Sequence, residues 1–283
     1  MLHEIRDLGF EYAELSHGTR ISLLPGILEA VDAGEIRISS LHNFCPLPMG
    51  VNHSAPNLFQ FSAEDPRERE NAHRHTLKTF DFAARVKASL IVLHLGSIDI
   101  KNYTDKLIDM VGRGEKETAR YERLCAEVTQ KRETKKEQFV GRTNEMLHRL
   151  LPEAEKRDLK LGIENREALE EIPLESDFRF FFKEFSSPAI GYWHDTGHAD
   201  IKEKMGLLKH REHLEKNAPR LLGFHLHDVN AEGRDHQPVG AGRIDFKMIS
   251  EFWKPEHLLV LEFSPRVSAE DVTLSKQRIE ALM

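Results

Sequence analysis

The sequence has few cysteines, no long apolar run and no excess of positive charge. Its two cysteines, Cys45 and Cys125, cannot form a disulfide framework, which fits a reducing compartment. No apolar run approaches the ~18 residues that a membrane-spanning helix needs. Residues 1–10 show neither the basic nor the apolar region of a signal peptide. We therefore expect a cytoplasmic protein that does not enter a membrane.

The composition is that of an acidic globular protein. The chain has 40 Lys and Arg against 47 Asp and Glu, and its net charge of −7 argues against a nucleic-acid partner, because phosphate contacts need a basic surface. At 283 residues and 40% hydrophobic, it can bury a large core. We expect one domain over residues 1–283, because α/β barrels use about 250 residues as one domain.

Seven short apolar runs rich in β-branched residues are predicted to be strands, and helical patterns lie between them. The runs are apolar on both faces, as is typical of parallel strands buried on both sides. Alternation of strands and helices predicts a parallel sheet with crossover helices. The predicted strands are residues 10–16, 38–44, 89–97, 159–165, 189–195, 221–228 and 258–264.

The connections complete this interpretation. Residues 45–64 are proline-rich without a helical period and are predicted to be a loop. Residues 100–157 predict an extra helix and a crossover helix, separated by a glycine-containing break. Residues 1–9 resemble a helix end with a glycine cap, and seven strands are one fewer than a closed barrel needs. We expect an α/β barrel of TIM type lacking its first strand in the given chain; an open doubly wound sheet is the alternative.

Each predicted strand ends in a carboxylate or an imidazole. In a parallel barrel these ends meet at one face, where active sites lie. Several carboxylates can converge there only with a counter-charge, and Lys and Arg are few at these positions. A divalent cation is the simplest counter-charge, and oxygen and imidazole ligands suit zinc, manganese or iron. The residues are Glu14, His42, His94, Glu164, Asp195, His225 and Glu262.

Each of these residues has a simpler interpretation when taken alone. A single histidine at a strand end more often bonds to a neighbouring backbone group than to a metal. His194 adjoins Asp195 and so faces the other side of its strand, toward the helix layer. His227 alternates with His225, and its direction is open. The glycines of GAGRID are too few for a dinucleotide motif, so no nucleotide cofactor is expected, and Asp245 is a candidate helix N-cap.

The segments GIEN, YWHDTGH, FHLHD, DHQPVGAGRIDF and VLEFS resemble the xylose isomerase-like TIM-barrel superfamily, in the order that its members have. The superfamily includes sugar isomerases, sugar epimerases and endonuclease IV. The resemblance implies a divalent metal (zinc, manganese, cobalt, magnesium or iron) held by Glu164, Asp195, His225 and Glu262. It also implies proton transfer by the two glutamates through an enediolate, with His198 near the substrate.

The resemblance to endonuclease IV adds further histidines. It implies extra metal ligands at His42, His94, His198 and His236. One position departs from that pattern, because Arg234 stands where the endonuclease has an aspartate, with Asp235 adjacent. In the isomerase interpretation His42, His94, His227, His236 and Arg234 bind substrate instead.

We expect an isomerase or epimerase of a small polyhydroxy carbonyl compound, such as a ketose, a sugar phosphate or a relative of inositol. An endonuclease IV-like phosphodiesterase acting on abasic DNA is the main alternative, and a barrel that only binds sugar is the other. The net charge and Arg234 favour the isomerase. The oligomeric state is open, and a homo-oligomer fits this class of protein.

Overall fold

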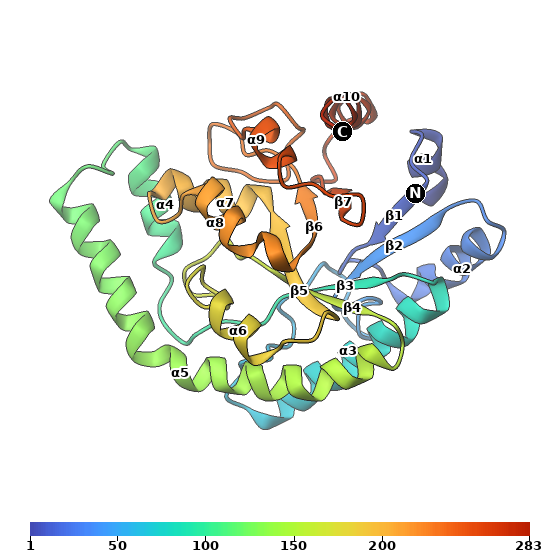
Figure 1. The fold of residues 1–283 in the computed structure, drawn as a ribbon, viewed down its shortest axis with the longest axis horizontal. Coiled ribbons are helices and arrows are strands. Elements are labelled where there is room, and N and C mark those ends of the chain that lie inside the picture. Colours follow the sequence, from blue (N-terminus) through green and yellow to red (C-terminus); the bar gives the residue numbers. More distant parts are fainter. The chain divides into compact units, whose positions relative to one another are not determined.

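The structure is a computed structural model and describes residues 1–283. Short parallel strands alternate with helices along the whole chain, as Figure 1 shows. The chain forms two compact units. The first comprises Met1–Gly96, Phe139–Ile163 and Phe182–Gly191, and the second comprises Ser97–Gln138, Glu164–Phe181 and Tyr192–Met283.

In the first unit, strands that follow one another along the chain pair in parallel. They are β1 (Tyr12–Leu15), β2 (Arg37–His42), β3 (Leu90–Leu93) and β4 (Lys160–Glu164). All four residues of β3, Leu-Ile-Val-Leu, are buried. An apolar run that is buried on both faces is what a central parallel strand requires, and the sequence pattern predicted it.

The first three helices have the ends that the sequence indicates. Helix α1 (Leu2–Asp7) is followed by Gly9 at φ +83°, a conformation that glycine adopts without strain. A 3-10 turn (Ile21–Leu23) leads into α2 (Leu24–Asp32). Residues 43–65 contain no helix or strand, which confirms the predicted loop. Helix α3 (Pro66–Val86) begins where Asp65 accepts a hydrogen bond from the Arg67 backbone N–H at 2.8 Å.

The second unit contains β5 (Ile190–Asp195), β6 (Leu221–Leu226) and β7 (Leu258–Leu261), again parallel and in chain order. Helices α7 (Thr196–Met205) and α8 (His210–Asn217) follow β5 directly and lie beside it (Figure 1). The other elements are α6 (Phe178–Glu184), a 3-10 turn (Ala218–Arg220), α9 (Phe246–Ser250) and α10 (Ala269–Glu280). Asp245 caps α9 by accepting the Met248 N–H at 3.0 Å, as predicted.

The long charged segment after β3 forms two helices, which confirms the prediction of an extra helix. They are α4 (Thr104–Gly112) and α5 (Ala119–Glu155), the longest helix in Figure 1. In the second unit α4 and the start of α5 pack on α7 through a buried apolar cluster that includes Tyr103, Leu107 and Met205. None of the helices combines the length and the apolar composition needed to cross a bilayer.

All seven predicted strands are present, and most end one to four residues before the predicted boundary. The residues that directly follow the strands are polar. The first strand begins at Tyr12. That a further strand is lacking, and that the whole chain is one domain, stay predictions.

Candidate functional site

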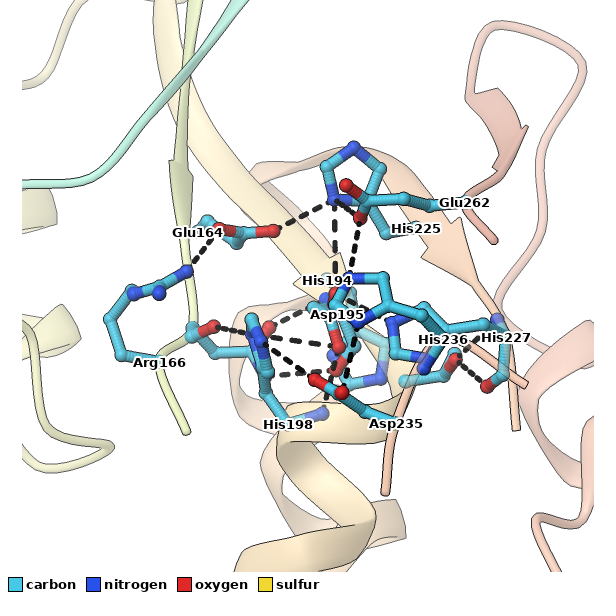
Figure 2. Close-up of polar contacts among 12 residues, drawn as sticks. Glu164, Arg166, His194, Asp195, His198, His225, His227, Asp235, His236 and Glu262 are labelled. Atoms are coloured by element: carbon cyan, nitrogen blue, oxygen red, sulfur yellow. Dashed lines mark hydrogen bonds and ion pairs between the residues drawn. The ribbon is translucent and has the colours of Figure 1, made fainter. Parts of the chain in front are cut away.

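Four side chains of the second unit, to which the last residue of β4 belongs, meet at the carboxyl ends of strands. Glu164 is the last residue of β4, Asp195 is the last of β5, His225 lies near the end of β6, and Glu262 follows β7. Their ligand-type atoms all lie within 4.8 Å of one another (Figure 2). Glu164, Asp195 and His225 are almost fully buried, and the Glu262 side chain is 22% exposed. The structure thus brings together the four predicted ligands.

His225 stands at the centre of this cluster. Its Nδ1 lies 2.7 Å from Glu164 Oε1 and 3.0 Å from Glu262 Oε2; in Figure 2 Glu164 reaches it from the left and Glu262 from the right. The same nitrogen is 3.8 Å from Asp195 Oδ2. The Trp193 ring packs edge-on against the imidazole, with centroids 5.1 Å apart. One ring nitrogen therefore faces all three carboxylates.

Asp195 links the strand to the next helix. As the N-cap of α7 it accepts the His198 backbone N–H at Oδ1, 2.7 Å away, while Oδ2 is 3.0 Å from His227 Nε2. Burial alone would raise the pKa of this carboxyl, but His198 and His227 hold the pKa well below its usual range. Asp195 is therefore ionised and can serve as a ligand for a cation.

Arg166 is a member of the site that the sequence analysis missed. Its buried guanidinium contacts Glu164 Oε2 and lies 3.1 Å from Glu171 Oε1. Burial opposes its charge, but Glu171 and Glu164 raise the pKa of Arg166 further. The premise that cations are scarce at the strand ends was thus wrong at this position. Its place two residues after Glu164, on the same side of an extended chain, was the available indication.

His227 and His236 form a stacked pair beside the cluster. Their ring centroids are 4.4 Å apart with an interplanar angle of 12°. His236 Nδ1 is 2.9 Å from Asp235 Oδ1, and Nε2 is 3.6 Å from Glu262 Oε2. Burial opposes charging, but these two carboxylates raise the pKa of His236 to about 11. His236 is therefore a second local counter-charge for Glu262.

His198 faces a further pair of acidic groups. Its Nε2 lies 3.8 Å from Asp235 Oδ2, and Glu167 completes a group whose ligand-type atoms lie within 4.8 Å. Burial raises the pKa of Glu167. Arg234 itself is exposed, whereas its neighbour Asp235 is half-buried and faces the histidines. The endonuclease pattern has an aspartate two positions before the loop histidine. In this chain the carboxylate is that of Asp235, directly before His236.

In the first unit, His42 and His94 lie together with their ring centroids 4.6 Å apart. His17, which the sequence analysis did not select, lies 4.6 Å from His42. The Nδ1 atom of His42 is 3.0 Å from its neighbour's carbonyl oxygen, and that of His94 is 3.0 Å from Asn57 Oδ1. A protonated Nδ1 donating to these oxygens fixes the tautomer and the direction of each ring. His17 lies two residues past its strand, so strand-end reasoning did not find it.

The four-residue cluster suits a divalent cation. It offers three carboxylates and one imidazole, the donor types of zinc and manganese sites, and no thiolate. The three carboxylates of the cluster have two cationic neighbours, Arg166 beside Glu164 and His236 beside Glu262. These two cations balance only part of the negative charge of the three carboxylates. The ligand-type atoms all lie within 4.8 Å of one another, close enough for one ion to contact them after small movements of the side chains.

The chain belongs to the xylose isomerase-like TIM-barrel family, whose model matches residues 2–256. Its fold is accordingly an α/β barrel of TIM type, as predicted. A search of curated proteins finds no match.

Three solved structures show the same fold. The chain is similar to a D-tagatose 3-epimerase-like protein (16% identity, TM-score 0.65), covering 99% of this chain and 91% of that one. It is similar to the D-psicose 3-epimerase of Clostridium cellulolyticum H10 (14%, TM-score 0.67, 99% and 92%). It is also similar to the D-allulose 3-epimerase of Methylomonas sp. (13%, TM-score 0.68, 100% and 90%). At these identities the likeness concerns the fold alone.

Proposed function

We propose that this protein is a divalent-metal-dependent isomerase or epimerase of a small sugar or related polyhydroxy carbonyl compound. The observation that carries the proposal is that Glu164 and Glu262, from two different strand ends, both reach His225 Nδ1, at 2.7 and 3.0 Å. Two carboxylates that face a substrate carbon from opposite sides are what an epimerisation needs. The sugar 3-epimerases among the structures of similar fold support this choice.

In the proposed reaction one of Glu164 and Glu262 removes a proton next to the substrate carbonyl, and the other returns a proton to the opposite face. Asp195 and His225 complete the ligand set. When bound, a divalent cation supplies a positive charge that polarises the carbonyl and stabilises the enediolate. Arg166 holds Glu164 in place through the buried ion pair.

Further residues are proposed to bind the substrate. His198 donates its Nδ1–H to the Asn165 carbonyl oxygen at 3.0 Å, so its Nε2 is the ring nitrogen that can hydrogen-bond a substrate hydroxyl. The further residues that we propose for substrate binding are His42, His94, His227, His236 and Arg234.

The test is hydrogen exchange with solvent. The metal-loaded protein is incubated with a panel of ketoses in deuterated water, and deuterium at carbon is measured by NMR. We expect incorporation next to the carbonyl, lost in Glu262→Gln and in Glu164→Gln. Glu251→Gln, at an exposed carboxylate paired with Arg211, is the control and should keep full activity. No incorporation into any sugar would contradict the proposal.

A second candidate is a phosphodiesterase acting at abasic DNA. The observation that favours it is the group of three neighbouring imidazoles in the first unit, which a one-metal isomerase does not need. The net charge of −7 stands against it. Cleavage of an abasic duplex at low salt that is lost in His42→Ala and His94→Ala, with no deuterium entering a sugar, would select this candidate.

A further inference from the structure

A buried polar network lies behind the site, between β5 and α8. The Tyr192 hydroxyl lies 2.6 Å from His194 Nδ1, 2.8 Å from His213 Nε2 and 3.1 Å from Asn165 Oδ1. The network continues from His194 Nε2 to His210 Nε2, 2.8 Å away. Tyr192 and His194 are fully buried, as predicted for a histidine facing the helix layer. Apolar residues would fill this space more simply, so the polar groups call for a physical reason.

The hydrogen atoms of this network can be assigned starting from Asn165. The Asp195 backbone N–H donates to Asn165 Oδ1 at 2.7 Å, and Asn165 Nδ2 donates to the Asp195 carbonyl oxygen at 2.9 Å. These two bonds fix the orientation of the amide. Because Asn165 Oδ1 can only accept, Tyr192 must donate its single hydroxyl hydrogen to it.

The histidines then follow. Tyr192 has no hydrogen left, so His194 Nδ1–H and His213 Nε2–H both donate to its oxygen. The His194 Nε2 lone pair accepts from His210 Nε2–H, and the His213 Nδ1 lone pair faces Asn217 Nδ2 at 3.3 Å. Burial lowers the pKa of each of these three histidines. Every one of these donors and acceptors is matched with the histidines neutral, and every bond along the chain points toward Asn165.

Asn165 in turn holds two residues of the site. Its side chain pairs with both backbone groups of Asp195, whose carboxylate belongs to the metal cluster. Its own carbonyl oxygen accepts His198 Nδ1–H at 3.0 Å, which fixes the direction of the ring and places Nε2 3.8 Å from Asp235 Oδ2. A hydrogen bond of this kind sets the tautomer and the direction of a ligating or substrate-binding histidine.

We propose that Tyr192 and Asn165 are a positioning pair: the Tyr192 hydroxyl, directed by the buried histidines, holds the Asn165 amide, and Asn165 holds Asp195 and His198 in their site geometry. Neither residue touches the substrate. The part of the proposal that concerns metal binding at Asp195 rests on the proposed function. The part that concerns the hydrogen bond of His198 does not, because that bond is present in the metal-free protein.

The first test is metal affinity, measured by titration with Mn²⁺. We expect Tyr192→Phe to weaken binding by about tenfold, the lower end of the range for residues that support metal ligands. Tyr121→Phe is the matched control, because it removes another buried hydroxyl, whose hydrogen bond goes to the Met205 carbonyl oxygen at 2.8 Å. It should leave the affinity unchanged. Equal weakening in both variants would reduce the effect to general loss of stability and overturn the proposal.

The second test asks whether Tyr192 acts through Asn165. We expect Asn165→Ala to weaken Mn²⁺ binding more than Tyr192→Phe does, and the double variant to be no weaker than Asn165→Ala alone. Additive losses would contradict the proposed coupling.

The third test needs no metal. Proton–nitrogen NMR spectra of the metal-free protein should show a slowly exchanging His198 Nδ1–H that is hydrogen-bonded to Asn165, and Tyr192→Phe should shift and broaden this signal while Tyr121→Phe does not. An unchanged His198 signal in Tyr192→Phe would overturn the proposal. If the wild-type protein binds neither Mn²⁺ nor Zn²⁺ but its His198 signal responds in this way, the proposed function fails and the positioning pair stands.

Discussion

At the scale of single residues, the charge balance around Glu164 decides most of the site's chemistry. Glu164 is buried and ionised between His225 Nδ1 and the Arg166 guanidinium. A buried carboxylate keeps its charge only beside a positive partner. Arg166 already is such a partner of Glu164, and the proposed divalent cation would be a second one. In the proposed function, Arg166 and the divalent cation are therefore two partners of the same carboxylate.

That relation predicts the effect of Arg166→Met. Removing the guanidinium leaves Glu164 and Glu171 without their cation, and breaking a buried pair costs about 3 kcal/mol of unfolding free energy. We expect Mn²⁺ to restore more stability to this variant than it adds to the wild type, as measured by thermal unfolding with and without the ion.

The control is Arg132→Met, which breaks the equally buried pair with Asp177 at 2.8 Å, away from the proposed metal ligands. It should lose comparable stability and gain from Mn²⁺ no more than the wild type does. Equal gains in the two variants would contradict the shared role of Arg166 and the metal.

At the scale of elements, the start of α7 and the end of β6 approach each other closely enough to decide the place of a side chain. Gly197 lies in the first turn of α7, and a Cβ there would come within 2.2 Å of the His227 ring. The absence of a side chain at this position lets His227 reach Asp195 Oδ2 at 3.0 Å. Packing therefore explains the glycine at position 197, because a side chain there would collide with the His227 ring.

We predict that Gly197→Ala folds but displaces His227. Overpacking of this kind costs about 1–3 kcal/mol, and loss of the contact to Asp195 should weaken Mn²⁺ binding about tenfold. Denaturant unfolding and metal titration measure the two effects. Gly141→Ala in α5, where a Cβ meets nothing within 4 Å, should keep its metal affinity and gain up to about 1 kcal/mol of stability. Normal metal binding in Gly197→Ala would show that the contact is dispensable.

At the scale of the whole molecule, the buried histidines make stability depend on pH. Burial lowers the pKa of His210 and of His213 to about 4. Glu203 raises the pKa of His210 and Glu175 raises that of His213, but neither restores the usual value. Arg243 and Lys202 lower these two pKa values further. In the unfolded chain these histidines have a pKa of about 6.5. Below that pH the unfolded chain binds protons that the folded protein does not bind. The stabilisation is therefore present above pH 6.5 and is lost as the pH falls toward 4.

The prediction concerns the difference between two proteins. Between pH 7.5 and 5.0 each of these histidines should cost about 2 kcal/mol of unfolding free energy. In His213→Gln, whose amide can still donate to Tyr192, the loss over this interval should be smaller than in the wild type by that amount. Urea unfolding at the two pH values measures it. Identical losses would mean that His213 is not neutral in the folded protein.

Some features of this protein follow from local pattern alone. The seven strands, the loop after β2 and the two helices after β3 were predictable, because apolar runs, prolines and glycines act on the chain where they stand. The convergence of Glu164, Asp195, His225 and Glu262 also followed, since the carboxyl ends of parallel strands meet at one edge.

Other features depended on which side chains meet across the fold. Arg166 was overlooked although its place two residues after Glu164 was an indication, because only the structure shows that its guanidinium contacts that carboxylate. The role of Tyr192 was invisible for the same reason, since its partners His194, His213 and Asn165 come from three separate segments. The sequence by itself determined the order of the strands and the chemical types at their ends. Only the tertiary structure decided the charge balance and hydrogen-bond direction at those ends, because both depend on distances between segments that no local pattern encodes.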